Sequence, residues 1–193
     1  MQNTGGYRLV LASKSPRRQQ LMEQLELNFE LRTKSVEENF DPEMNPYQVP
    51  EYLAGLKAEA MMAELAANEL LITADTVVIL QGEIIGKPEN ELAAKAMLKR
   101  LSGQTHDVVT GVQLQSQQKK STFSSCTKVH FKTLSDEMIE HYVKTYRPLD
   151  KAGAYGIQEW IGAVGIDRIE GSYYNVMGLP VAQLWEELKR FID

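Results

Sequence analysis

The segment LASKSPRR, residues 11–18, concentrates hydroxyl and cationic side chains at one turn. An apolar run leads into it, and Ser15 followed by Pro16 is a favourable pair for the N-cap and first turn of a helix. Such a turn leaves amide N–H groups at the positive end of the helix dipole, where an anion binds well. Arg17 and Arg18 add forked donors that match phosphate oxygens. The alternative is that Ser15 only caps the helix and both arginines lie on its solvated face.

Asp75 interrupts the apolar run at residues 70–80, LLITADTVVIL. A carboxylate in a strand of this kind is costly to bury without a partner. If it faces a cleft, it could bind a divalent metal or accept a proton from water. The alternative is an aspartate at a strand bulge, satisfied by backbone N–H groups. Glu37 and Glu38, in the acidic stretch VEENFDPE, either supply a second carboxylate for the same metal or lie in a solvated loop.

Two lysines lie where cations could meet a phosphate. Lys87, in the short motif GKP, either presents its ammonium to phosphate or is an ordinary lysine of a surface turn. Lys57, in an otherwise apolar helical segment, either extends to solvent or points into a charged site. The three histidines have no ligand-like spacing, and no catalytic pairing of serine or cysteine with histidine is evident. Cations and carboxylates without a covalent nucleophile are typical of metal-assisted phosphoryl or nucleotidyl transfer.

Composition excludes several other classes of protein. At 193 residues with 43% hydrophobic content, the chain is expected to form one compact domain, or two lobes that share one core. A net charge of −5 argues against a surface for nucleic acid polymers. The single Cys126 indicates a reducing compartment and no structural zinc site. Without a secretory signal or a stretch long enough to cross a bilayer, we expect a cytoplasmic protein that binds no membrane.

The elements that position these residues alternate between strands and helices. This alternation predicts an α/β fold, and a central hairpin predicts a mixed sheet. Residues 150–180, rich in glycine, are expected to form loops and a strand, and a boundary between lobes would fall near Gly103 or Pro148. The expected strands are 9–12, one near 28–32, 70–80, 106–115 and 121–133. The expected helices are one from Ser15, 52–68, one from Asn90 to near Gly103, one from Ser135 to before Pro148, and 180–192.

Six motifs occur in one order along the chain: LASKSPRR, ITADTVV, GKP, VVTGV, DKAGAYGIQ and GSYYNVMGLP. In order and spacing they resemble the Maf family of nucleoside triphosphate pyrophosphatases, from residue 9 to residue 193. The resemblance implies one Maf-like domain over residues 1–193, with a mixed sheet flanked by helices and two lobes around a deep cleft. This fold is similar to that of the inosine triphosphate pyrophosphatases. Family members are often dimeric, so a homodimer is an expectation.

The resemblance also implies a reaction and roles for single residues. Members of the family hydrolyse nucleoside triphosphates to the monophosphate and pyrophosphate with a divalent cation, here magnesium, manganese or cobalt. Asp75 matches the catalytic carboxylate that accepts a proton from the attacking water, and it would share the metal with Glu38. Four residues match the groups that line the triphosphate site: Ser13, Arg18, Lys57 and Lys87.

Three further positions match the branch of the family that acts on dTTP and UTP: Arg17, Thr76 and Gln158. The branch that acts on 7-methyl-GTP carries an aromatic residue, a glutamine and a glutamate there instead. An amide such as Gln158 can both donate and accept, as a uracil or thymine edge requires, whereas a carboxylate suits the N–H donors of guanine. We therefore expect a dTTP and UTP pyrophosphatase. The alternatives are a 7-methyl-GTP pyrophosphatase and a nucleotide-responsive regulator of septum formation.

One position departs from the family pattern. Many relatives have glycine directly after the GIQ of the fifth motif, where this chain has Glu159. A bulky acid there is expected to bear on base selectivity more than on the reaction itself.

Overall fold

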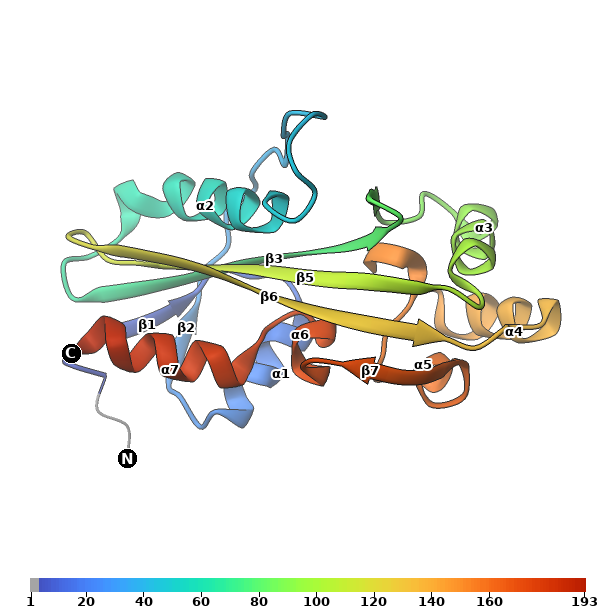
Figure 1. Cartoon of the computed structure of the whole chain (residues 1–193). Coiled ribbons are helices and arrows are strands. Elements are labelled where there is room, and N and C mark those ends of the chain that lie inside the picture. The colour runs from blue at the N-terminus through green and yellow to red at the C-terminus, as the bar shows by residue number, and fades with distance from the viewer. Residues whose placement is uncertain (1–3) are drawn as a thin grey trace. The chain divides into compact units, whose positions relative to one another are not determined.

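The computed structural model describes residues 4–193, which form a mixed seven-stranded sheet flanked by helices (Figure 1). The strands lie in the order β2-β1-β3-β5-β6-β7, and β4 pairs with β3. β1 is parallel to both β2 and β3, whereas the β3–β4 and β6–β7 pairs are antiparallel, so the predicted α/β fold with a mixed sheet is confirmed. The strands are β1 (Arg8–Leu11), β2 (Phe29–Leu31), β3 (Glu69–Leu80), β4 (Glu83–Ile85), β5 (Thr105–Gln115), β6 (Lys120–Phe131) and β7 (Ile166–Glu170).

The helices follow most of the boundaries that the sequence indicates. Asn90 and Ser135 cap their helices as expected, accepting hydrogen bonds from Ala93 N (2.9 Å) and Met138 N (3.3 Å). The glycine-rich stretch, expected to be loop and strand, also contains two short helices, which local sequence alone rarely specifies. The helices are α1 (Pro16–Gln24), α2 (Val49–Met61), α3 (Glu91–Leu101), α4 (Asp136–Tyr146), α5 (Trp160–Gly165), α6 (Tyr173–Met177) and α7 (Val181–Ile192), with 3-10 turns η1 (Met62–Glu64) and η2 (Ala152–Ala154).

The helix expected over residues 52–68 is displaced toward the N-terminus. It begins at Val49, because a proline in the first turn, Pro50, is compatible with helix initiation. It ends at Met61 and continues only as the 3-10 turn η1. The chain then turns into β3, where the backbone N–H of Glu69 donates to the carbonyl of Ala66 (3.0 Å).

The chain divides into two compact units. Within the described part of the chain, the first unit consists of residues 4–75, 110–125 and 178–193. The second consists of residues 76–109 and 126–177. The divisions fall inside β3, β5 and β6 and after α6, rather than at Gly103 or Pro148.

In the first unit, β1 lies between β2 and β3, and all three are parallel. α1 connects β1 to β2, and α2 connects β2 to β3, so that α2 covers one face of these strands and α1 and α7 the other (Figure 1). The connection from β1 to β2 and the connection from β2 to β3 therefore run in opposite directions along the sheet. The carboxyl end of β1 is a topological switch point, the place where open α/β sheets bind ligands. The α2 face is closed by an apolar cluster: Val10, Ala58, Met61, Leu65 and Leu71.

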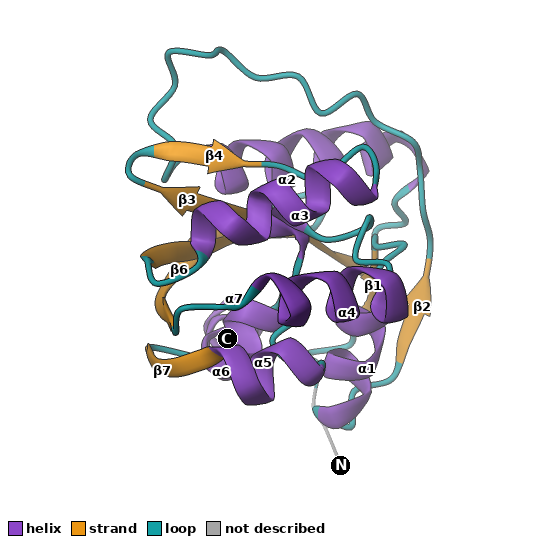
Figure 2. Ribbon diagram, turned by 90° about the vertical axis from the view of Figure 1, so that its right-hand side faces the viewer, coloured by secondary structure: helices purple, strands orange, loops and turns teal. Residues whose placement is uncertain are grey.

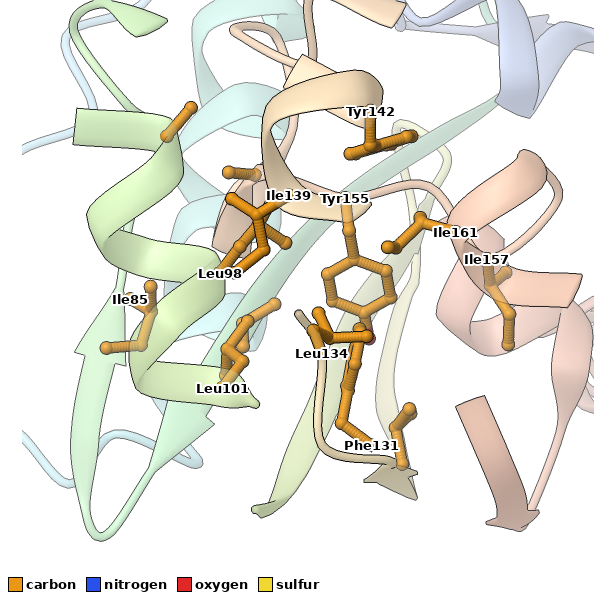
Figure 3. Packing of buried hydrophobic residues seen from close by; sticks show 14 of the residues in the cluster. Ile85, Leu98, Leu101, Phe131, Leu134, Ile139, Tyr142, Tyr155, Ile157 and Ile161 are labelled. Atoms are coloured by element: carbon orange, nitrogen blue, oxygen red, sulfur yellow. The ribbon is translucent and has the colours of Figure 1, made fainter. Parts of the chain in front are cut away.

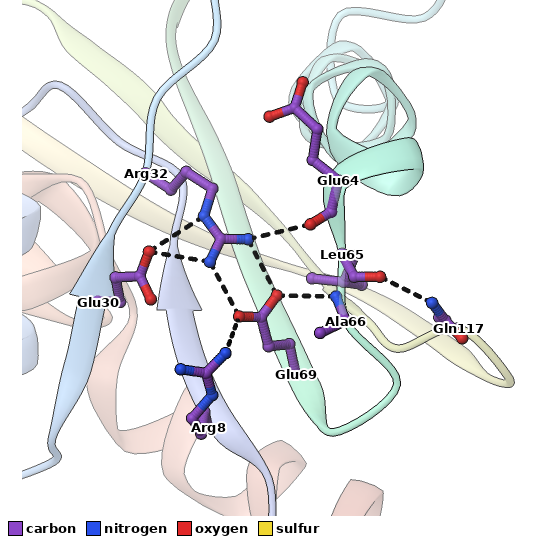
Figure 4. Close-up of polar contacts among 8 residues, drawn as sticks. All are labelled: Arg8, Glu30, Arg32, Glu64, Leu65, Ala66, Glu69 and Gln117. Atoms are coloured by element: carbon purple, nitrogen blue, oxygen red, sulfur yellow. Dashed lines mark hydrogen bonds and ion pairs between the residues drawn. The ribbon is translucent and has the colours of Figure 1, made fainter.

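A buried carboxylate, Glu69 at the amino-terminal end of β3, is 1% exposed and binds arginines from the start of β1 and from the segment directly after β2 (Figure 4). Arg32 forms a bidentate pair with Glu69, with both N···O distances 2.9 Å, and Arg8 approaches it to 2.7 Å. The N–H of Ala66 adds a hydrogen bond of 2.9 Å. The Arg32 hydrogen bonds lower the pKa of Glu69 to about 2, so the carboxylate remains charged in this unit.

The second unit has its own core, in which β4 pairs with β3 and α3 packs beside α4 (Figure 2). Leu98 of α3 and Ile139 of α4 belong to the apolar cluster drawn in Figure 3. The Tyr155 ring meets Phe131 edge-on, with centroids 5.1 Å apart, and both rings contact His106. His106 also forms a 2.7 Å hydrogen bond with the hydroxyl of Tyr155. It is therefore a core residue, consistent with its lack of ligand-like spacing.

Candidate active site

The turn after β1 folds back on itself at the switch point. Ala12 N donates to Ile72 O of β3 (2.9 Å), which extends the strand pairing into the turn. The Ser13 hydroxyl accepts from Ser15 N (3.2 Å), and accepting this bond leaves the hydroxyl proton for another acceptor. Ser15 is the N-cap residue of α1, as expected, but its side chain makes no capping hydrogen bond. The expectation that its hydroxyl caps the helix is wrong.

Arg18, on the first turns of α1, is held against backbone that is distant in sequence. Its Nε donates to Gly178 O (2.7 Å) and its Nη1 to Ala74 O (2.9 Å). Burial lowers the pKa of Arg18, while the charges of Asp75 and Glu38 raise it, so both carboxylates lie close enough to act on the guanidinium. An arginine remains charged in proteins at neutral pH. Arg18 thus places a fixed positive charge beside the carbonyl that precedes Asp75.

Asp75 of β3 and Lys57 of α2 form an ion pair and hydrogen bond between Nζ and Oδ1. The same ammonium lies 2.9 Å from Oε1 of Glu38, in the loop between β2 and α2. The side chains of Lys57 and Asp75 are only 17% and 12% exposed, whereas that of Glu38 is 45% exposed. Lys57 therefore points into a charged cluster rather than out to solvent. Asp75 has a cationic side chain as partner, so its burial does not depend on a strand bulge.

A buried hydroxyl connects the two elements that carry this ion pair. Thr73 Oγ1 donates to Ala54 O at 2.7 Å, and both residues are fully buried. Thr73 precedes Asp75 by two positions on β3, so the two side chains leave the strand on one face. Ala54 precedes Lys57 by three positions on α2. The hydrogen bond therefore fixes the helical turn of Lys57 against the strand face of Asp75.

Gly111 of β5, in the VVTGV motif, allows the start of α2 to approach the sheet. A Cβ on Gly111 would overlap the backbone of Pro50 and Glu51 in the first turn of α2. Glycine is required here by the close approach of two backbones. The motif thus contributes to the placement of α2, and with it of Lys57.

The other predicted site residues are distributed over both units. Arg17 is half-buried on α1 in the first unit. In the second unit, Thr76 follows Asp75 on β3 and is half-buried, and Gln158 is exposed just before α5. Lys87 follows β4, is exposed, and its side chain makes no hydrogen bond or ion pair within residues 4–193. The structure thus brings Arg18, Glu38, Lys57 and Asp75 together in the first unit.

Sequence reasoning missed Thr73 and the partners of Glu159. Thr73 gives a local signal, because it is a second polar residue in the apolar run and lies two positions before Asp75. The contacts of Glu159 with Tyr142 and Lys151 give no such signal, because these three residues come from different elements of the second unit.

Glu38 and Asp75 are the carboxylates available to a divalent cation in this cluster. No group of three or more histidine, cysteine or acidic side chains in the described residues could hold a metal ion. Magnesium bound together with a phosphate substrate needs only one or two carboxylates and completes its shell with water and phosphate oxygens. Two carboxylates that converge on one ammonium suit an ion that arrives with the nucleotide.

The comparisons with known proteins agree with the motifs. Residues 8–191 match a family model described as Maf-like protein. The chain belongs to the Maf family. The dTTP/UTP pyrophosphatase of Porphyromonas gingivalis (strain ATCC 33277) is 49% identical to this Maf protein over 99% of this chain and 98% of that protein. The dTTP/UTP pyrophosphatase of Phocaeicola vulgatus is 47% identical over 98% and 99%, respectively.

Among solved structures, the Ham1 protein of Staphylococcus aureus aligns with a TM-score of 0.48 and 17% identity, over 64% of this chain and 71% of that chain. A likeness this partial does not identify a function. In the part of this Maf protein that the structure describes, no helix combines the length and apolar character needed to cross a bilayer.

Proposed function

We propose that this Maf protein hydrolyses dTTP and UTP to the nucleoside monophosphate and pyrophosphate. The observation that carries the proposal is the cluster of Asp75, Lys57 and Arg18 at the switch point of the first unit. The names of relatives nearly half identical over their full length support the choice of substrate. Hydrolysis by positioning and charge neutralisation needs no covalent nucleophile, in keeping with the residues of the cluster.

In this reaction, water attacks the α-phosphorus and the bond from that phosphorus to the α–β bridging oxygen breaks. Asp75 accepts the proton of the water, and the bridging oxygen leaves with pyrophosphate. Lys57 donates to Asp75 before substrate binds; a phosphate oxygen that takes over this ammonium would free the carboxylate to accept the proton. Three cations, Arg18, Lys57 and Lys87, would offset the charge of the triphosphate, and the Ser13 hydroxyl would donate a hydrogen bond to it.

A divalent cation, for which magnesium, manganese and cobalt are the candidates, would be held by Glu38 and Asp75. When bound, it would supply Lewis-acid polarisation of phosphate oxygens. For the base, we propose Arg17, Thr76 and Gln158 as the residues that select uracil or thymine. The exposed amide of Gln158 has the donor and the acceptor that these bases require.

The experiment is a pyrophosphate-release assay over canonical and modified triphosphates, including 7-methyl-GTP, with each of the three metals. We expect dTTP and UTP to be the best substrates. Asp75→Asn should reduce turnover by about 10²–10⁴-fold, whereas Asp167→Asn, an exposed aspartate on β7, should leave it unchanged. Normal turnover in Asp75→Asn would show that Asp75 is not the base. Preference for 7-methyl-GTP would contradict the assignment of the substrate.

We also propose that the protein acts in the cytoplasm, where its nucleotide substrates are found and where the single Cys126 remains reduced. A homodimer stays a prediction from the family resemblance. Light scattering of the purified chain at several concentrations tests it directly.

A further inference from the structure

We propose that Glu159 is a positioning residue for base selection. Together with Tyr142 and Lys151 it holds residues 156–159, and with them the amide of Gln158. The inference rests on the proposed function, which assigns Gln158 to the base. It gives a role to the residue at which this chain departs from the family pattern.

The contacts of Glu159 lie within the second unit. The Tyr142 hydroxyl of α4 donates to Oε2 of Glu159, and the Lys151 ammonium lies 3.1 Å from Oε1. The same Tyr142 hydroxyl accepts from Gly156 N at 3.0 Å. Glu159 N in turn donates to Gly156 O at 3.0 Å, which closes a tight turn around Gln158. Both ends of the four-residue segment are therefore bound to one tyrosine hydroxyl.

This tyrosine is a rigid anchor. Tyr142 is fully buried in the core of the second unit, and its ring stacks on Tyr146 with centroids 5.1 Å apart. Burial, together with the hydrogen bond to Glu159, raises the pKa of Tyr142, so the hydroxyl keeps the proton that it donates. A loop residue that is fixed to a packed helix holds its geometry better than one supported only by neighbouring loop atoms.

The charge of Glu159 is directed away from solvent. Its side chain is 19% exposed and that of Lys151 is 10% exposed, so the pair is largely withdrawn from water. A buried carboxylate with an ammonium and a hydroxyl as partners is satisfied, whereas one that loses a partner is costly to keep buried. We therefore expect Glu159 to act on selectivity through the loop, rather than as a free negative charge near the base.

The contacts of Tyr142 and Lys151 with Glu159 form a clamp on residues 156–159, and Gly156 lies close to both this clamp and the Gln158 amide. An ideal Cβ on Gly156 would lie 2.9 Å from Nε2 of Gln158 and 3.1 Å from Oε1 of Glu159. The bare Cα of this glycine therefore makes room for both side chains. A displacement of the Glu159 carboxylate would open space next to the Gln158 amide, which could then rotate away from a single orientation.

Orientation matters because an amide distinguishes bases only by where its donor and acceptor point. The uracil edge presents the acceptor O4 and the donor N3–H, whereas cytosine presents the donor N4 and the acceptor N3. A fixed Gln158 can match one of these patterns and leave unpaired groups with the other. If the amide turns over freely, it can serve both bases, and discrimination between UTP and CTP falls.

The test compares kcat/KM for UTP with kcat/KM for CTP. We expect Glu159→Ala and Tyr142→Phe to lower this ratio about tenfold, with a lower value for UTP and a higher value for CTP. Glu159→Gln keeps an oxygen that can accept from Tyr142 and should restore part of the ratio. Glu140→Gln is the control for loss of an acidic charge: Glu140 lies on α4, the helix of Tyr142, and pairs with Lys144 and with Lys95 of α3. It should leave the ratio unchanged. Tyr142→Phe retains the buried ring, so it tests the proposal even where Glu159→Ala does not fold.

The outcomes separate the clamp from the assignment of the base site. If Gln158→Ala lowers the ratio but the Glu159 and Tyr142 variants do not, the clamp is wrong and the base assignment stands. If the variants reduce both kcat/KM values equally while the melting temperature falls, their role is structural and the proposal is overturned. If Gln158→Ala leaves the ratio unchanged, Gln158 does not select the base, and the proposed role of Glu159 is wrong as well. A wild-type enzyme that hydrolyses neither UTP nor dTTP would contradict the proposed function itself.

Discussion

The ammonium of Lys57 donates to the carboxylate of Asp75 and lies 2.9 Å from Oε1 of Glu38, so one cation is shared by both carboxylates of the candidate site. A divalent cation that uses the same two carboxylates must compete with this ammonium. In the proposed reaction Lys57 would therefore have two effects that oppose each other. It would neutralise the charge of the triphosphate during turnover, and it would weaken the binding of metal when no nucleotide is present.

Lys57→Met should separate these effects. We expect turnover of dTTP to fall about 10²–10³-fold, because a preorganised cation is lost. Binding of manganese without nucleotide, measured by calorimetry, should become tighter, because the two carboxylates no longer share an ammonium. Lys34→Met removes an exposed lysine that pairs with Glu64 and should change neither quantity. Unchanged manganese affinity in Lys57→Met would show that Glu38 and Asp75 are not the metal ligands.

The hydrogen bond from Thr73 to Ala54 O should matter for catalysis as well as for stability. Thr73→Val keeps the shape of the side chain but removes the donor, at an expected cost of about 1 kcal/mol in the free energy of unfolding. Because α2 would then shift relative to β3, we expect turnover to fall about tenfold. Thr73→Ser retains the hydroxyl and should recover most of the activity. Full activity in Thr73→Val would mean that packing alone positions Lys57.

The fold could be predicted where local signals were strong. The apolar run around Asp75 predicted a central strand because β-branched residues buried on both faces have a distinctive composition. The helix caps at Asn90 and Ser135 could also be predicted from local sequence. Each cap is a hydrogen bond from the backbone N–H three residues later to the side chain of the capping residue. α5 was not predicted, because two glycines in six residues oppose helix formation and tertiary contacts override that preference.

The candidate site could be predicted only as a set of residue types. Arg18 is bound to Gly178 O, 160 positions away, and no local pattern distinguishes this from an arginine on a solvated helix face. The choice between solvent and a charged site for Lys57 was open for the same reason. Contacts with residues distant in sequence determine where the side chains of Arg18 and Lys57 lie. Such contacts follow from the order of the strands rather than from the periodicity of the sequence.

His106 should make the protein sensitive to mild acid. Burial lowers its pKa to about 4, below the ordinary value of 6.5. As the pH falls from about 6.5 toward 4, the unfolded chain binds a proton that the folded chain does not, so stability is lost in this window. The loss between pH 7 and pH 5 should be about 2 kcal/mol.

Urea unfolding of wild type and His106→Gln at pH 7 and pH 5 measures this contribution. The glutamine can still bond with the Tyr155 hydroxyl but does not titrate, so the variant should lose less stability than wild type on acidification. His141→Gln, which removes an exposed histidine on α4, is the control for loss of an imidazole. An equal loss in wild type and His106→Gln would show that this histidine does not determine the response.

Glu69 should govern stability in a lower and separate range of pH. Its folded-state pKa of about 2, set mainly by the hydrogen bonds from Arg32, lies below the ordinary value of 4.5. The contribution of the Glu69 charge to the free energy of unfolding is therefore fully present above about pH 4.5, and it is lost as the pH falls toward 2. Glu69→Gln should be less stable than wild type by about 1–2 kcal/mol at pH 6, a modest figure because Arg8 is largely exposed and screened.

That difference should shrink at pH 3, because the unfolded wild-type chain binds a proton at Glu69 there, whereas the folded chain mostly does not. It is measured as the change in urea midpoint between the two proteins. Glu59→Gln, an exposed residue on α2, should track wild type at both pH values. If the difference in stability between wild type and Glu69→Gln is the same at pH 6 and pH 3, Glu69 stabilises β1 and β3 through packing. Its ion pairs with Arg8 and Arg32 then contribute nothing to stability.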